Sequence, residues 1–439
     1  MRYYLDPFGC AKNQVDAENM MACLNSAGWS AAVDAEEADI IIVNSCGFIE
    51  SAKRESIDAV IGWRRLYTDK KILLSGCLAQ RYPKELAESL SEADGFFGTE
   101  DISNIVRKVN SLFNETISLL PTARCPLPTA SRPLLSLPGS AYVKISEGCD
   151  NRCAFCAIPL IRGPLRCRNV EDIVDECRGL LARGIRELCI IGQDIGSYRS
   201  GGLALPELLN AIAGLSGDFW VRLLYMHPDH FPLSILDIIE RDTRFLPYFD
   251  IPFQHSSQKI LRAMNRRGMA DDYITLAETI RGRLPAAVIR STFLVGFPGE
   301  TDADFASLLD FQDKIRPDWL GCFSYSREDG TAAYTMKGRV PKKIAAARKR
   351  EIEDRQIKIT EQSMDHFIGQ SLNVLLEEQF DSGEDAESEG LWLGRLYCQA
   401  PEVDGAAVVA GESPRLKAGA VVPCRVTARR GIDLEVKPL

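Results

Sequence analysis

Six short apolar runs alternate with helical stretches between residues 141 and 325, and this repeat constrains the fold more than any other feature. The runs are Ala141–Ser146, Leu188–Ile191, Trp220–Tyr225, Tyr248–Phe253, Val288–Val295 and Leu320–Tyr325. Strands joined by helices run parallel, because a parallel connection needs a long crossover. A closed barrel of this kind has about eight units, so six predict a partial, open (β/α)6 barrel whose active site lies at the carboxyl ends of its strands.

Residues 1–120 carry the same alternation on a smaller scale. Asp39–Asn44 and Lys71–Ser75 are continuous apolar runs, as in buried parallel strands, and Ile49–Leu66 between them is helical by pattern. This part predicts a small doubly wound α/β domain. Residues 121–140 contain five prolines and predict an extended linker at a domain boundary.

The carboxyl-terminal part of the chain has a different pattern. Residues 341–367 predict one long, charged helix. Five strand-like runs follow it, separated by Gly and Pro, and they predict a small five-stranded barrel of the OB type. These runs are Leu372–Glu377, Leu391–Cys398, Ala406–Ala410, Ala420–Thr427 and Ile432–Val436. The predicted domains are therefore residues 1–120, 141–366 and 367–439, with the linker at 121–140.

The composition limits the class of protein and its location. No stretch approaches the ~20 apolar residues of a spanning helix, and the first residues lack the apolar core of a secretory signal, so we expect a cytoplasmic protein with no membrane partner. The net charge of −9 offers no support for a broad nucleic-acid surface, and we expect any such contact to be secondary. In a reducing compartment, the 14 cysteines are expected to be thiols or metal ligands.

Three of these cysteines form a compact motif, GCDNRCAFC, directly after the first run of the predicted barrel. Cys149, Cys153 and Cys156 are spaced so that one loop can wrap three thiolates around an iron–sulfur cluster. A structural zinc site would normally be closed by four ligands, and Cys167 lies too far along the chain to look like the fourth. Three ligands leave one iron open to another molecule.

Three further cysteines in the first domain each follow a strand-like run or lie close to one. They are Cys10, Cys46 and Cys77. The carboxyl ends of parallel strands share one edge of a sheet, where ligands usually bind, so the three thiols could hold a second cluster. From spacing alone, three ordinary buried cysteines explain the pattern slightly better.

The GCDNRCAFC motif resembles the radical S-adenosylmethionine (SAM) superfamily. In that superfamily the open iron binds SAM, and the aromatic residue before the last cysteine, here Phe155, packs near its adenine. Several further segments resemble the methylthiotransferase branch: FGCAKNQVDAE, VNSCGF, SGCLAQRYP, CAIPLIRG, IIGQDIGSY and VGFPGETDADF. The resemblance covers nearly the whole chain and implies a carboxyl-terminal TRAM domain.

The resemblance to the methylthiotransferases also implies a site. It makes Cys10, Cys46 and Cys77 the ligands of an auxiliary [4Fe–4S] cluster, and Cys149, Cys153 and Cys156 the ligands of a SAM-binding [4Fe–4S] cluster. Gln193 falls in a segment that the family places near SAM. SAM would serve both as methyl donor and as radical source, with an electron donor such as flavodoxin or ferredoxin. The two clusters would have to face one cavity.

Within the family, GQD at 192–194 and FDIPFQHSS at 249–257 resemble the branch that modifies the β-carbon of an aspartate in small-subunit ribosomal protein twelve. The alternative is the branch that modifies an adenosine of tRNA. From residue 366 onwards, 12 acidic and 7 basic residues give a net charge of −5, which suits a basic ribosomal protein better than RNA. A third alternative is an iron–sulfur RNA-binding module without catalysis.

Four polar side chains near the motifs have two interpretations each. His227 and His255 could touch substrate, but a satisfied, partly buried histidine is equally compatible with the sequence. Arg152 and Arg162 flank the cysteine motif and could hold a carboxylate or SAM, although solvated loop charges are the simpler interpretation.

Overall fold

The computed structural model describes residues 1–113, 130–380, 390–411 and 415–439, so residues 121–129 of the predicted linker lie outside the described part. The described chain forms two compact units. The first unit contains residues 1–135, 146–166 and 326–334, and the second contains 136–145, 167–325 and 335–439. The predicted domain limits differ from this grouping and stay a prediction.

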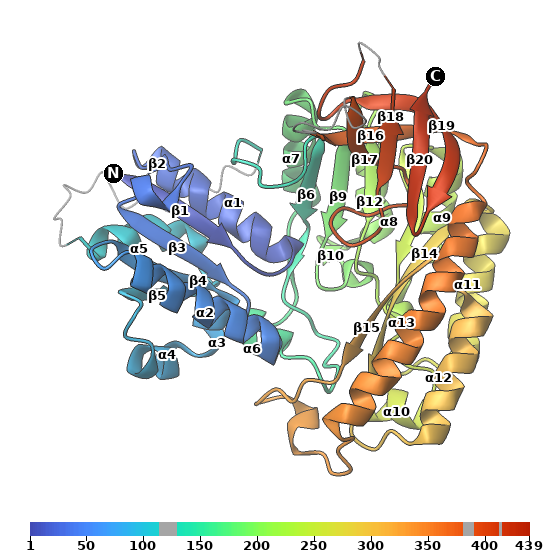
Figure 1. The fold of residues 1–439 in the computed structure, drawn as a ribbon, viewed down its shortest axis with the longest axis horizontal. Coiled ribbons are helices and arrows are strands. Elements are labelled where there is room, and N and C mark those ends of the chain that lie inside the picture. The colour runs from blue at the N-terminus through green and yellow to red at the C-terminus, as the bar shows by residue number, and fades with distance from the viewer. Residues whose placement is uncertain (114–129, 381–389, 412–414) are drawn as a thin grey trace. The chain divides into compact units, whose positions relative to one another are not determined.

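The first unit is built on a parallel sheet in the order β2-β1-β3-β4-β5 (Figure 1). Its strands are β1 (Arg2–Pro7), β2 (Ser30–Ala31), β3 (Ile40–Ser45), β4 (Lys71–Gly76) and β5 (Gly95–Phe97). Its helices are α1 (Ala11–Ser26), α2 (Glu50–Leu66), α3 (Cys77–Arg81), α4 (Pro83–Ser89), α5 (Ile105–Ser111) and α6 (Ile158–Arg162), and a short strand β7 (Ser146–Glu147) precedes α6.

The central strand β3 shows why this sheet is covered on both faces. Successive side chains of a strand point to opposite faces, and here both sets are apolar. Ile40 and Ile42 pack in one core with residues of α1 and α5. Ile41 and Val43 pack in the other core with residues of α2 and α4. The predicted doubly wound α/β domain is therefore confirmed.

The second unit contains a six-stranded parallel sheet in the order β15-β14-β13-β12-β9-β6. The strands are β6 (Ser140–Lys144), β9 (Glu187–Ile191), β12 (Trp220–Leu223), β13 (Phe245–Asp250), β14 (Val288–Val295) and β15 (Trp319–Ser324). Each strand pairs with the next one along the chain, as in a β/α barrel, but the sheet does not close. This confirms the predicted partial (β/α)6 barrel.

Helices connect these strands. They are α7 (Val170–Ala182), α8 (Leu205–Ala213), α9 (Ile235–Arg241), α10 (Gln258–Ala263), α11 (Ala270–Arg283), α12 (Asp302–Ile315) and α13 (Lys342–Asp365), which follows β15. Thr301 starts α12 with a capping box, because its side chain accepts from the backbone of Asp304 while the Asp304 carboxylate accepts from the backbone of Thr301. Two short hairpin strands, β10 (Arg199–Ser200) and β11 (Leu203–Ala204), precede α8, and β8 (Arg166–Cys167) lies at the limit of the two units.

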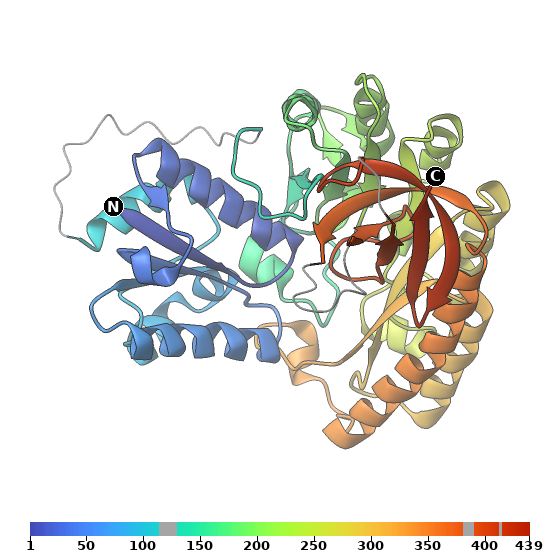
Figure 2. The ribbon, with the colours of Figure 1, turned by 45° about the horizontal axis from the view of Figure 1, so that its top comes forward.

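The carboxyl-terminal strands close a small barrel in the order β16-β17-β18-β20-β19. Figure 2 shows this barrel in orange and red. They are β16 (Ser371–Gln379), β17 (Leu391–Arg395), β18 (Ala407–Ala410), β19 (Val421–Arg430) and β20 (Asp433–Pro438). All five overlap the predicted runs, and the predicted OB-like barrel is confirmed. Closing the sheet removes the open edges that a five-stranded sheet would otherwise expose.

A buried ionic network fastens this small barrel to the open barrel within the second unit. Glu187 of β9 is completely buried and pairs with Arg222 of β12 at 2.7 Å and with Arg395 of β17 at 2.5 Å. Arg395 also pairs with Glu377 of β16 at 2.6 Å. Paired charges are tolerated in a core where single charges are not. Among the described residues, no helix combines the length and the apolar character needed to cross a bilayer.

Candidate active site

The three cysteines of the first domain lie at the carboxyl edge of the first sheet. Cys10 is the residue that caps the start of α1, Cys46 follows β3 directly, and Cys77 is the first residue of α3 after β4. The thiol groups lie close enough for Cys10 and Cys46 each to act electrostatically on Cys77. The structure thus brings together the three thiols that the sequence placed at one edge.

Glycines beside these cysteines allow the loops to approach one another. A Cβ atom on Gly47 would lie 2.6 Å from the carbonyl oxygen of Cys77, and one on Gly76 would lie 2.6 Å from that of Ser45. Gly76 also has φ of +93°, which favours glycine. The loops that carry Cys46 and Cys77 are therefore packed backbone to backbone. This packing fixes the positions of the backbone from which the two cysteine side chains project.

The surroundings of the three thiols differ. Desolvation opposes ionisation of Cys10, but the charges of Lys12 and Arg162 and two backbone N–H groups outweigh it and hold the pKa of this thiol below its usual value. Burial raises the pKa of Cys46, and it raises the pKa of Cys77 to about 12. A metal ligand must lose its proton, so binding of iron to Cys77 would displace a proton.

The second cysteine group stands on the loop of residues 149–156. Cys149, Cys153 and Cys156 are all half-buried, and the loop turns where the backbone N–H of Cys156 donates to the carbonyl of Cys153 at 2.9 Å. The backbone of Arg152 is in the left-handed region, with φ of +52°. Gly148 leaves no room for a Cβ, which would lie 2.1 Å from the carbonyl oxygen of Pro164. These features give a tight loop with three thiols on it.

Both cysteine groups belong to the first compact unit. Cys77 packs in one buried cluster with Ala157 and Ile161, which follow the second group directly. Within the described residues, no three His, Cys, Asp or Glu side chains converge tightly enough for a single metal ion. A four-iron cluster spreads its thiolates farther apart, and each set of three thiols fits such a cluster by ligand type and number.

The two residues predicted to contact SAM occupy different units. Phe155 is half-buried within the cysteine loop of the first unit. Gln193 is half-buried in the second unit, two residues beyond the carboxyl end of β9. That end of a β/α barrel is where active-site residues stand. Their assignment to SAM stays a prediction.

Asp194, next to Gln193, organises the neighbouring loops, a role that its place in the GQD motif at 192–194 does not reveal. It is buried, and it accepts hydrogen bonds from the backbone N–H of Gly196 and of His227. Its other oxygen lies 3.0 Å from Nδ1 of His230, which is half-exposed and whose pKa is raised chiefly by this hydrogen bond. The signal for this group was the histidine pair in HPDH, but sequence could not show which carboxylate it meets.

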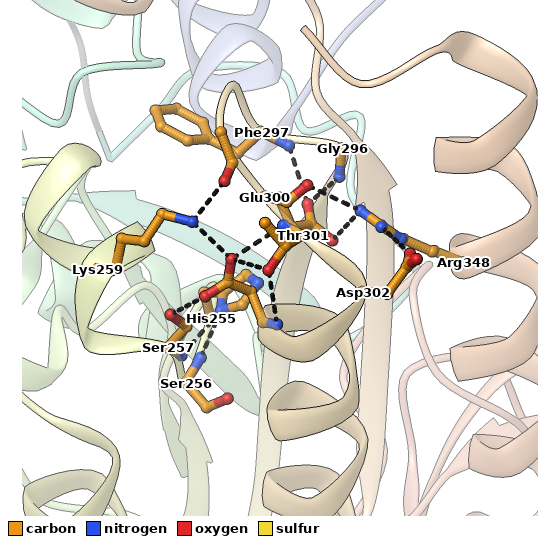
Figure 3. Close-up of polar contacts among 12 residues, drawn as sticks. His255, Ser256, Ser257, Lys259, Gly296, Phe297, Glu300, Thr301, Asp302 and Arg348 are labelled. Carbon is orange, nitrogen blue, oxygen red and sulfur yellow. Dashed lines mark hydrogen bonds and ion pairs between the residues drawn. The ribbon is translucent and has the colours of Figure 1, made fainter. Parts of the chain in front are cut away.

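The two histidines named from the sequence are both buried. Burial lowers the pKa of His227 to about 3, and its ring accepts from the backbone N–H of Asp229. His255 is completely buried, and its Nδ1 accepts from the backbone N–H groups of Ser256 and Ser257, both at 2.9 Å (Figure 3). His255 is therefore a core histidine, but it is satisfied on one side only, because its buried Nε2 has no hydrogen-bond partner among the described residues.

The loop in front of His255 is held by charged side chains. Glu300 accepts from the backbone N–H groups of Gly296 and Phe297 and pairs with Arg348 of α13 at 3.0 Å (Figure 3). Lys259 pairs with Asp304 at 2.9 Å. These contacts explain the PGETDAD segment as a loop fixed at the carboxyl end of β14.

The arginines beside the cysteine motif differ in burial. Arg152 is exposed, whereas Arg162 is buried and contacts protein carboxylates and Cys77. Cys167 is half-buried and its sulfur accepts from the backbone N–H of Arg199. The remaining seven cysteines share no spacing in the sequence, which predicts ordinary thiols. Cys125 lies outside the described residues, and the other six are buried: Cys23, Cys177, Cys189, Cys322, Cys398 and Cys424.

Residues 326–334 are part of the first unit, which sequence reasoning missed. Glu328 in this segment is buried and pairs with Lys53 of α2 at 2.9 Å and with Arg81 of α3 at 2.8 Å. The backbone N–H of Ala333 donates to the carbonyl of Ala154, inside the cysteine loop. The segment thus contacts the helices next to the first cysteine group and the loop that bears the second. These residues are far apart in the sequence, so no local sequence pattern could predict the contacts.

Three family models match the chain. Residues 2–98 match the uncharacterized protein family UPF0004, residues 143–311 the radical SAM superfamily, and residues 368–438 the TRAM domain. Among solved structures, the radical S-adenosylmethionine methyltransferase TsrM from Kitasatospora setae is similar with a TM-score of 0.55 and 14% identity, over 76% of each chain. At this identity the likeness shows the fold alone. The open parallel barrel and the cysteine loop after its first strand define a radical SAM protein.

Curated relatives narrow this class. The chain is 45% identical to the ribosomal protein uS12 methylthiotransferase RimO of Treponema denticola, over 98% of this chain and 99% of the relative. It is 38% identical to the RimO proteins of Carboxydothermus hydrogenoformans, over 99% of both chains, and of Aquifex aeolicus, over 97% of this chain and 94% of the relative. The chain belongs to the ribosomal protein uS12 methylthiotransferase RimO family.

Proposed function

We propose that this protein replaces a hydrogen on the β-carbon of an aspartate in ribosomal protein uS12, the small-subunit protein twelve, with a methylthio group. The observation that carries the proposal is the 45% identity, over 98% of the chain, to a relative named for methylthiotransfer to uS12. The other relatives described above carry the same name. The tRNA adenosine alternative is therefore not favoured, and the radical SAM match argues against a module without catalysis.

The family uses SAM and [4Fe–4S] clusters, and these groups, when bound, supply the radical and the sulfur that no protein side chain can provide. Cys10, Cys46 and Cys77 hold the auxiliary cluster at the carboxyl edge of the first sheet. Cys149, Cys153 and Cys156 hold the SAM-binding cluster on their loop. Both sets of cysteines lie in one compact unit, which supports the assignment of one cluster to each set.

The remaining side chains of the site bind and orient the reactants. We assign Phe155 and Gln193 to SAM binding, as the resemblance to the family implies. SAM serves as methyl donor and as radical source. Asp194 joins the loops after β9 and β12 by hydrogen bonds to the backbone of His227 and the ring of His230. These bonds fix the loop that contains Gln193.

The partners follow from charge and chemistry. Six of the twelve acidic residues beyond residue 366 lie in segments 381–389 and 412–414, outside the described residues, and these acidic segments suit a basic ribosomal protein. An electron donor such as flavodoxin or ferredoxin would supply the electron that the SAM-binding cluster needs. Contact with nucleic acid is secondary, and the protein works in the cytoplasm.

The test is an anaerobic assay of the reconstituted protein with reductant, sulfide and SAM, offering uS12 and hypomodified tRNA in parallel. Mass spectrometry is expected to find the methylthio group on the uS12 aspartate alone. Cys156→Ala is expected to abolish release of deoxyadenosine, whereas Cys77→Ala retains that release and loses the methylthio product. Cys167→Ser serves as the matched control with both activities. Modification of tRNA alone would overturn the proposed substrate.

A further inference from the structure

Arg162 is the last residue of α6, six residues beyond Cys156, and its side chain is only 1% exposed. Its guanidinium donates a hydrogen bond to Sγ of Cys77 at 3.1 Å. It also pairs with Asp16 of α1 and with Glu147 of β7, both at 2.8 Å. A single buried cation from the cysteine loop therefore contacts a thiol of the other cysteine group.

The two carboxylates account for the burial of this arginine but leave its contact with sulfur unexplained. Asp16 and Glu147 both contact Nη1 of Arg162, which would satisfy the charge by themselves. The other terminal nitrogen, Nη2, donates to Sγ of Cys77 at 3.1 Å and, at the longer distance of 3.4 Å, to Oδ1 of Asn13. Because the guanidinium is planar and rigid, fixing one nitrogen with two carboxylates fixes the direction of the other. The carboxylates thus aim an N–H group at the thiol.

We infer that Arg162 is a positioning residue for the auxiliary cluster, donating a hydrogen bond to the Cys77 thiolate and raising the reduction potential of that cluster. The inference rests on the proposed role of Cys77 as a cluster ligand. Hydrogen bonds to the sulfurs and the local net charge set the potential of an iron–sulfur cluster within its range. A positive donor on the thiolate stabilises the reduced cluster, which carries one more negative charge, over the oxidised one.

The same contact couples the two cysteine groups. Ala157, the N-cap of α6, and Ile161 within α6 pack against Cys77 in one buried cluster. The hydrogen-bond donor to Cys77 and the apolar packing around Cys77 thus both come from the helix that follows the second cysteine group.

The experiment uses the full chain with Cys149, Cys153 and Cys156 all changed to Ala, so that only the auxiliary cluster can assemble from ferrous iron and sulfide. Stepwise reduction with dithionite, followed by electron paramagnetic resonance, gives the potential of the cluster. Arg162→Gln is expected to shift it to more negative values, and Arg162→Lys, which keeps the charge, to shift it less. Arg65→Gln, an exposed position on α2, is the matched control and is expected to leave it unchanged.

Each result decides the question. Equal potentials in the parent, Arg162→Gln and Arg162→Lys chains, at equal iron content, overturn the inference while leaving the proposed function in place. A parent chain that holds no cluster although Arg162 is intact shows that the proposed ligands themselves are wrong. A graded shift, with the control unmoved, supports the inference, because loss of packing alone would not follow the charge of the side chain.

Discussion

At the scale of single residues, buried polar side chains of this protein hold loops by bonding to the backbone. His255 is the clearest case, because one ring nitrogen satisfies two backbone N–H groups at the end of β13. Glu300 does the same for Gly296 and Phe297 at the end of β14. Both residues stand in segments whose resemblance to the family suggested a role at the site. Their contacts show how one buried side chain can hold the backbone of such a segment in place.

The burial of His255 can be tested by comparing how the unfolding free energy of the wild type and of His255→Gln depends on pH. Burial, aided by Arg348 and Lys259 and opposed by Asp304, lowers the pKa of His255 from 6.5 to about 3. Below pH 6.5 the unfolded chain therefore binds a proton that the folded chain does not, and stability falls as the pH is lowered toward 3. We expect the wild type to lose about 1.4 kcal/mol per pH unit more than the variant between pH 6 and 4. Urea unfolding measures this, and parallel profiles would contradict it.

At the scale of elements, the strands could be predicted because each is a short apolar run, and the edge position of Cys10, Cys46 and Cys77 followed from those runs. The grouping of elements could not be predicted. The contacts Arg162–Cys77 and Arg81–Glu328 join residues 85 and 247 positions apart, and they place residues of the barrel sequence in the first unit. Such contacts depend on how distant segments fit together in the folded chain, and the hydrophobic periodicity of a single segment does not predict this.

The close approach of two loops makes Gly47 a sharp test of the first cysteine group. Gly47→Ala would place a Cβ 2.6 Å from the carbonyl oxygen of Cys77, where backbone must move. We expect the variant to lose the auxiliary cluster and about half of its iron, since each proposed cluster holds about four. Gly62→Ala, in the open on α2, should keep all of its iron and gain about 0.5–1 kcal/mol of stability. Iron analysis after reconstitution decides it, and a full complement in Gly47→Ala would refute the argument.

In residues 326–334, the only described salt bridges to α2 and α3 are those of one buried carboxylate, Glu328. Glu328→Gln leaves Lys53 and Arg81 without their shared charge partner, and breaking a buried pair costs about 3–5 kcal/mol. We expect faster amide hydrogen exchange in this segment and in α3. Exposed Glu88→Gln on α4 is the control and should leave exchange unchanged. Unchanged exchange at residues 326–334 in Glu328→Gln would show that the other contacts of the segment, such as Tyr82–Asp329 and Ala333–Ala154, hold it without the charge of Glu328.

At the scale of the whole molecule, charge that is buried between barrels binds the second unit together. Glu187 joins Arg222 of the open barrel to Arg395 of the small barrel. Arg395 is held in turn by Glu377. The sequence indicated a change of architecture near residue 367. Nothing in it showed that Glu187 of the open barrel would pair with Arg395 of the small barrel. Apolar burial drives each barrel to fold, and this network fixes how they meet.

Glu187→Gln therefore tests the attachment of the two barrels. Removing one partner from this buried network is expected to cost about 3–5 kcal/mol at pH 7. Burial alone would raise the pKa of Glu187, but Arg395 and Arg222 outweigh it and hold it at about 2. The contribution of the carboxylate is thus complete above 4.5, its usual value, and is lost as the pH falls toward 2.

The measurement that checks this prediction is urea unfolding of wild type and Glu187→Gln at pH 7, 5 and 3. The difference in unfolding free energy should be largest at pH 7, nearly as large at pH 5 and clearly smaller at pH 3. Exposed Glu278→Gln on α11 removes a carboxylate without a buried partner and should change stability little at any of these values. A difference that stays constant down to pH 3 would mean that Glu187 acts by its shape, since only its charge titrates in this range.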